Sequence, residues 1–100
     1  MNDYLLLMHD DALQASDAQS EPAWTRYLDS LRRSGRFDGG SAIGLGACHR
    51  RSAPPAPLSA SLTGYLRVQA ESLEEAKRFL AGNPVYEAGG SVEIRELPRD

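Results

Sequence analysis

The chain has 100 residues, 41% of them hydrophobic, and a formal net charge of −3, which indicates one globular domain over residues 1–100. Dispersed basic residues argue against nucleic acid as a partner, and no run approaches the roughly 18 apolar residues of a membrane helix. The single cysteine, Cys48, excludes an internal disulfide and a cysteine-built metal site. It is typical of the reducing cytoplasm, where we expect this protein, because the chain also begins without a signal-peptide pattern.

An apolar strand is predicted at the start of the chain. Residues 3–9 are apolar on both faces, which is typical of a strand that is covered on both sides. We expect the polar residues 10–20 to form a loop. Pro22 then favours the start of a helix, with Ser20 or Glu21 near its N-cap.

The first predicted helix carries one apolar stripe and ends at Gly35. The stripe follows the spacing i, i+3, i+4 and i+7 and consists of Trp24, Tyr27, Leu28 and Leu31. The opposite face is expected to carry Arg26, Asp29, Arg32 and Arg33. If Trp24 is a core residue, Trp24→Ala costs about 3–5 kcal/mol. A small loss of stability together with a loss of ligand binding would instead indicate a pocket wall.

The middle of the chain predicts two strands joined by a loop. A glycine-rich strand is expected from Phe37 to Cys48, where the glycines favour a bulge or a close backbone approach. Residues 52–61 contain three prolines and are expected to form a loop. In the next strand, residues 62–69, Leu66 and Val68 alternate with Tyr65 and Arg67 on the other face.

The last third predicts a helix and a closing strand. Ser72 and Glu75 have the spacing of a capping box, in which each side chain bonds to the other residue's backbone amide. The helix is expected to run to about Ala81 and to turn Leu73, Ala76, Phe79 and Leu80 inward. Pro84 is expected to prevent the helix from continuing. The final strand is expected to begin near Val92.

The element order β-α-β-β-α-β predicts an α+β protein with the ferredoxin-like fold. This fold is a four-stranded antiparallel sheet with both helices on one face and strands one and three in the centre. We expect Leu5, Leu7, Leu66, Val68 and either Val92 or Ile94 to pack under the helices. Tyr4, Leu6, Met8, Tyr65 and Arg67 are then expected on the helix-free face.

That helix-free face is predicted to be too apolar to lie against water. A symmetric homodimer, sheet on sheet in the manner of dimeric α/β barrels, would cover it. The alternative is a monomer whose proline-rich loop folds over the face.

A set of short motifs, in order along the chain, resembles the YCII-related proteins and their branch named for a DGPF motif. The motifs are Trp24 with Tyr27-Leu28, Gly35 with Asp38-Gly39-Gly40, Gly64-Tyr65, Ser72-Leu73-Glu74-Glu75-Ala76, Asn83-Pro84 with Ala88-Gly89, and Val92-Glu93-Ile94-Arg95. The resemblance implies a small dimeric α+β protein. Many members have no known function, and a few are similar to muconolactone-type or chlorinated-catechol pathway enzymes.

Two positions depart from the family pattern. The YCII branch typically has a histidine on the first helix and an aspartate before the late proline, which are proposed to act as an acid–base pair. This chain has Trp24 and Asn83 at the matching positions, and neither an indole nor an amide transfers protons in this way. The DGPF motif is also missing, so the resemblance transfers no catalytic residue to this chain.

His9 and Asp38 are the candidates for acid–base chemistry. His9 is followed by Asp10 and Asp11 and has the residue types of a proton-transfer group or of part of a metal site. A solvated strand end explains the same pattern. Asp38 precedes Gly39-Gly40 and either lines a cleft between helix and sheet or accepts hydrogen bonds within a turn.

Other residues are candidates for ligand binding. His49, followed by Arg50 and Arg51, fits an anionic ligand or an exposed hairpin end. Tyr65 and Arg67 fit a pocket between subunits or the dimer interface itself. We expect no metal and no cofactor, because the sequence has no phosphate loop, paired cysteine site or nucleophile elbow.

Two functions from different classes fit this sequence. The first is a non-catalytic, dimeric module that binds a small anionic or aromatic ligand, or another protein. The second is a cofactor-independent isomerase or lyase that acts on a small carboxylate or lactone. A third interpretation is a domain that joins a larger regulatory assembly. An enclosed cleft with two titratable groups within hydrogen-bond reach would favour the enzyme. A filled cleft, or a cleft lined only by Trp24, Tyr27 and aliphatic side chains, would favour the module.

Overall fold

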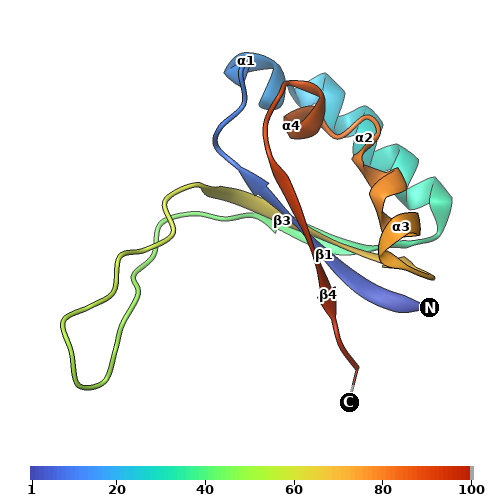
Figure 1. Cartoon of the computed structure of the whole chain (residues 1–100). Helices are drawn as coiled ribbons and strands as arrows, with labels where there is room; N and C mark the ends of the chain where they lie inside the picture. The colour runs from blue at the N-terminus through green and yellow to red at the C-terminus, as the bar shows by residue number, and fades with distance from the viewer. Residues whose placement is uncertain (100) are drawn as a thin grey trace.

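The computed structural model describes residues 1–99, which form one four-stranded antiparallel sheet with all helices on one face (Figure 1). The elements in chain order are β1 (Asn2–His9), α1 (Ala15–Ala18), α2 (Glu21–Ser34), β2 (Phe37–Ala42), β3 (Leu62–Ala70), α3 (Leu73–Ala76), the 3-10 helix η1 (Lys77–Leu80), α4 (Pro84–Glu87) and β4 (Val92–Leu97). The strand order is β2-β3-β1-β4. Strands β1 and β3 are therefore central, and the predicted ferredoxin-like fold is confirmed.

Helix α2 has the predicted start and end. The Ser20 hydroxyl accepts a hydrogen bond from the Ala23 N–H, and Gly35 ends the helix with φ at 73°, a left-handed conformation that glycine adopts without steric cost. Tyr27 and Leu31 are buried against the sheet. Within residues 1–99, no helix is long and apolar enough to cross a membrane.

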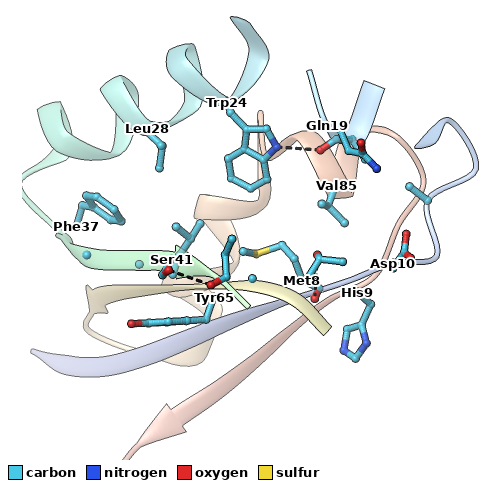
Figure 2. A pocket seen from close by; sticks show the side chains of 18 of the residues that line it. Met8, His9, Asp10, Gln19, Trp24, Leu28, Phe37, Ser41, Tyr65 and Val85 are labelled. Carbon is cyan, nitrogen blue, oxygen red and sulfur yellow. Dashed lines mark hydrogen bonds between the residues drawn. The ribbon is translucent and has the colours of Figure 1, made fainter. Parts of the chain in front are cut away.

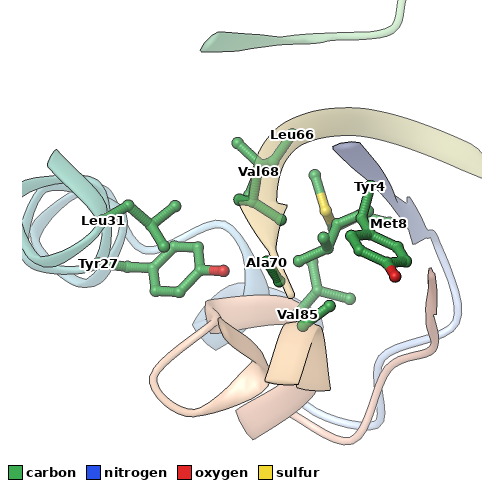
Figure 3. Packing of buried hydrophobic residues seen from close by; sticks show 10 residues of the cluster. Tyr4, Met8, Tyr27, Leu31, Leu66, Val68, Ala70 and Val85 are labelled. Carbon is green, nitrogen blue, oxygen red and sulfur yellow. The ribbon is translucent and has the colours of Figure 1, made fainter. Parts of the chain in front are cut away.

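The side chains of β1 that pack under the helices are Tyr4, Leu6 and Met8, whose exposed fractions are 3%, 0% and 3%. Figure 3 shows Tyr4 and Met8 within this core cluster. The prediction that these three side chains emerge on the helix-free face was wrong. Leu5 and Leu7 lie on that face instead, each only partly buried.

The register with β3 explains this exchange of faces. Leu6 pairs with Leu66 and Tyr4 pairs with Val68, and directly paired residues of neighbouring strands lie on the same face. The alternation in β3 was predicted correctly, because its apolar and polar residues differ. In β1 both faces are apolar, so the sequence of this strand alone does not specify which set turns inward.

Two predicted loop boundaries were also wrong. Residues 10–20 contain the short helix α1, and β2 ends at Ala42 rather than at Cys48. A long loop over residues 43–61 follows and extends well beyond the sheet (Figure 1). On this loop Leu45 is fully exposed and Leu58 is about half exposed. The loop does not fold back to cover the sheet.

The second predicted helix, to about Ala81, is divided into α3 and the 3-10 helix η1, and a further short helix, α4, follows it. Leu73 is exposed rather than inward. The Ser72 hydroxyl caps the Glu75 N–H as predicted, but the Glu75 carboxylate accepts from the Glu71 N–H, 3.1 Å away, and not from Ser72. Pro84 does not prevent a further helix, because a proline is well accommodated at a first helical position, and α4 begins there.

Candidate ligand-binding pocket

A pocket of 610 Å³ lies between α2 and the sheet, beside residues 10–19 (Figure 2). Its walls are mainly apolar and include Met8, Trp24, Leu28, Phe37, Leu66 and Val85. Cavities of this size and character typically hold small organic molecules. The pocket is therefore the candidate functional site.

Trp24 forms part of the pocket wall in a fixed orientation. Its indole N–H donates to the Ala18 carbonyl at 2.8 Å, and its ring meets Tyr27 edge to face, with ring centroids 5.8 Å apart. The ring is only partly buried and lines the open space below α2 (Figure 2). A rigid aromatic face at a pocket is suited to stacking against a planar ligand.

The glycine-rich strand β2 contributes the edge of the pocket near β3. A bulge lies between Phe37 and Gly40. A side chain at Gly40 would overlap with the Tyr65 carbonyl oxygen and lie 2.8 Å from Leu66 Cδ2. Glycine at this position therefore permits the close approach of β2 to β3 that was predicted from the glycine content.

Residues 10–19 form another wall and are tied to the start of β4 and the end of α4. The Asp11 carboxylate accepts from the Ser91 N–H at 2.7 Å and from the Ser91 hydroxyl at 2.6 Å. The Gln14 N–H donates to the Ala88 carbonyl. The hydrogen bonds from Ser91 hold the pKa of Asp11 below its usual value, since they favour the charged carboxylate.

Asn83 and Tyr27 lie behind the pocket, in the core. Asn83 is fully buried, and its side-chain oxygen accepts from the N–H groups of Val85 and Tyr86. Its side-chain nitrogen has no partner among residues 1–99. Burial raises the pKa of Tyr27, whose hydroxyl donates to the Phe79 carbonyl. Asn83 is thus the N-cap of α4, which is a structural role.

His9 and Tyr65 contribute to the pocket lining, but both rings lie on the other side of the strands from Trp24 (Figure 2). His9 Nδ1 is 2.9 Å from the Ser61 hydroxyl, and Nε2 is 3.3 Å from a Glu93 carboxylate oxygen. The pKa of Glu93 is lowered chiefly by its hydrogen bond with Arg95, and to a smaller extent by its hydrogen bond with His9. The imidazole is therefore engaged with polar groups at the end of the sheet.

The remaining predicted site residues lie away from the pocket. Asp38 pairs with Arg67 at 3.3 Å, and both side chains are about half exposed on the side of the sheet opposite the helices. His49 is exposed in the loop of residues 43–61. The structure thus does not bring Asp38, Arg67 or His49 together with Trp24. Within residues 1–99, no three His, Cys, Asp or Glu side chains converge as a metal site would require.

Arg32 and Phe37 also line the pocket, although neither was predicted from the sequence as a site residue. Arg32 was expected on the outer face of α2, yet it lines the pocket with Trp24 and Leu28. These three positions are spaced i, i+4 and i+8, which places them on one side of a helix. The spacing therefore indicated that Arg32 lies on the same side of the helix as Trp24, although the charge of Arg32 favoured a position facing solvent.

The chain is similar in structure to a solved protein and in sequence to a family model. No curated protein matches it in sequence. A solved structure, 5-chloro-2-hydroxyhydroquinone dehydrochlorinase from Burkholderia phenoliruptrix in complex with 2,5-dihydroxybenzoquinone, matches with a TM-score of 0.63 and 18% identity, covering 98% of this chain and 95% of that one. At this identity the similarity establishes a shared fold. The family model described as the YCII-related domain matches residues 2–99, and the chain therefore belongs to the YCII-related family.

Proposed function

We propose that this protein binds a small planar aromatic ligand in the pocket below α2 and does not transform it. The observation that supports this most directly is the apolar pocket of 610 Å³ with the fixed ring of Trp24 in its wall. An aromatic ligand gains both from the burial of its apolar surface and from ring stacking.

The titratable groups around the pocket favour binding over catalysis. His9, Asp10, Arg32 and Tyr65 are the titratable residues in its lining. In the described part of the chain, no hydrogen bond or ion pair joins two of these side chains. Two titratable groups within hydrogen-bond reach of each other would favour an enzyme, and the described lining of this pocket holds no such bonded pair.

A small isomerase or lyase is the second candidate. The specific support for it is the similar fold of the dehydrochlorinase, a structure that contains a bound quinone. Asp10, an exposed residue of the pocket lining, would then be the group to move a proton. Fold similarity is a weak guide to reaction chemistry, so this function ranks second.

Calorimetric titration with a panel of aromatic carboxylates, phenols and lactones tests the proposal. We expect saturable binding of at least one aromatic compound, which Trp24→Leu weakens by about tenfold or more, equivalent to about 1.4 kcal/mol. Tyr86→Leu is the control, because Tyr86 is an exposed aromatic outside the pocket. NMR spectra of the ligand after incubation separate the two functions: an unchanged ligand supports binding, and a new product supports the enzyme. No binding across the panel would contradict the proposal.

The proposal includes a homodimer formed through the helix-free face. Leu5, Leu7 and Tyr65 lie on this face and are only partly buried in the single chain, so a second copy would remove apolar surface from water. We expect Leu7→Asp to fold but to sediment as a monomer at concentrations where the wild type is a dimer. Leu73→Asp, on exposed α3, should remain dimeric. A monomeric wild type would contradict this part of the proposal.

A further inference from the structure

The pocket is elongated along α2 and differs in charge between its two ends. Trp24, Leu28 and Arg32 succeed one another on the pocket side of this helix. With a rise of 1.5 Å per residue, Trp24 and Arg32 are separated by about 12 Å along the helix axis. Asp10 and Phe37 lie at opposite ends of the pocket (Figure 2), and Arg32 is beside Phe37.

The position of the Arg32 guanidinium is defined by two contacts. Its central carbon lies 5.9 Å from the centre of the Phe37 ring, within the range of a cation–π contact. One of its nitrogen atoms is 3.3 Å from the Asp29 carboxylate. The guanidinium is thus placed at the Phe37 end of the pocket, where its other N–H groups are able to meet a ligand.

The pair with Asp29 does not prevent Arg32 from binding a ligand. The two side chains are 60% and 51% exposed, and an ion pair this open to water contributes little to stability. A carboxylate that enters from the pocket can therefore replace Asp29 at small cost. A planar carboxylate also accepts two parallel hydrogen bonds from a guanidinium, which is stronger and more directional than a single bond.

We infer that Arg32 selects aromatic ligands whose carboxylate is separated from the ring by a short flexible chain. This inference rests on the proposed function of the pocket. The aromatic ring lies against Trp24, the chain passes along Leu28, and the carboxylate reaches the guanidinium of Arg32. The distance along α2 makes 3-phenylpropanoate or 4-phenylbutanoate a better fit than benzoate, whose carboxylate is attached directly to the ring.

The experiment compares the affinity for an acid with the affinity for its neutral amide, in the wild type and in matched variants. Wild-type protein is titrated by calorimetry with benzoate, 3-phenylpropanoate, 4-phenylbutanoate and 3-phenylpropanamide. We expect 3-phenylpropanoate to bind about tenfold or more tightly than its amide, because hydrogen bonds to charged groups are the stronger class. Arg32→Gln should abolish this preference, whereas Arg33→Gln, an exposed neighbour outside the pocket lining, should retain it. Asp29→Asn should strengthen binding of the acid, because it removes the competing carboxylate.

The outcomes distinguish this inference from the proposed function. If acid and amide bind the wild type equally, or if Arg33→Gln loses the preference as Arg32→Gln does, the role of Arg32 is overturned while the pocket remains a binding site. Tighter binding of benzoate than of the longer acids would overturn the assigned spacing. If neither acid nor amide binds, this inference fails, whereas the proposed function fails only if the wider panel of aromatic carboxylates, phenols and lactones also shows no binding.

Discussion

Leu6→Ala should lower the free energy of unfolding by about 2–5 kcal/mol, the usual cost of removing a buried leucine side chain. Leu6 has no exposed surface and lies in a central strand, paired with Leu66 on one side and Ile94 on the other. A cavity at this position is enclosed by the sheet and helices, so the surroundings have little freedom to collapse into it. Urea denaturation followed by circular dichroism measures the change.

Leu73→Ala is the matched control for Leu6→Ala. It removes the same atoms from a leucine whose exposed fraction is 48%, so we expect a change within about 0.5 kcal/mol, as for most surface substitutions. The pair also tests the assignment of faces in β1. Equal effects of the two substitutions would show that Leu6 does not lie under the helices.

Asn83→Ala should destabilise the protein by about 2–4 kcal/mol, because it removes a helix N-cap and leaves buried N–H groups without an acceptor. The side-chain oxygen of Asn83 accepts from the N–H groups of Val85 and Tyr86 at 3.0 and 3.1 Å. Water does not readily replace this oxygen, because Asn83 is fully buried. Thermal and urea unfolding of the purified variant measure the effect.

Ser20→Ala provides the comparison for Asn83→Ala. Ser20 caps α2 through one longer hydrogen bond of 3.4 Å, at a partly exposed position. Its removal should cost about 0.5–1 kcal/mol, at the low end for N-caps. A smaller loss for Asn83→Ala than for Ser20→Ala would contradict the structural role assigned to Asn83.

Local signals in the sequence predicted the fold well. Ser20, Pro22 and Gly35 mark the two ends of α2 through capping and backbone geometry that depend on a few neighbouring residues. The alternation of apolar and polar residues in β3 identified its buried face. These signals, with the order of elements, were sufficient to predict the sheet topology.

Features that depend on tertiary contacts were not predictable in the same way. The inward face of β1 is determined by its register with β3, since Leu5 and Leu6 are equally apolar. Leu73 has the spacing of a buried residue in one continuous helix, but α3 ends at Ala76 and Leu73 is exposed. Helix α4 was missed because a proline was taken only as a helix breaker, although Asn83 supplies a cap before it.

The candidate site was predicted only in part. Trp24 was considered as a pocket wall, and the structure places it there. His9 and Asp38 were chosen for their titratable side chains, yet they pair with Glu93 and Arg67. Which polar group faces a cavity depends on strand register and on distant partners, and a single sequence does not contain that information explicitly.

The most direct test of the pocket as the ligand site is an NMR titration of ¹⁵N-labelled protein with 3-phenylpropanoate. Trp24 is the only tryptophan, so its indole N–H gives a single, assignable signal. We predict saturable shifts of this signal and of the backbone amides of Gly39 and Gly40. Shifts that spare these three signals and instead affect residues such as Arg26 and Gly82, which line a second pocket on the other side of α2, would contradict the assignment of the pocket.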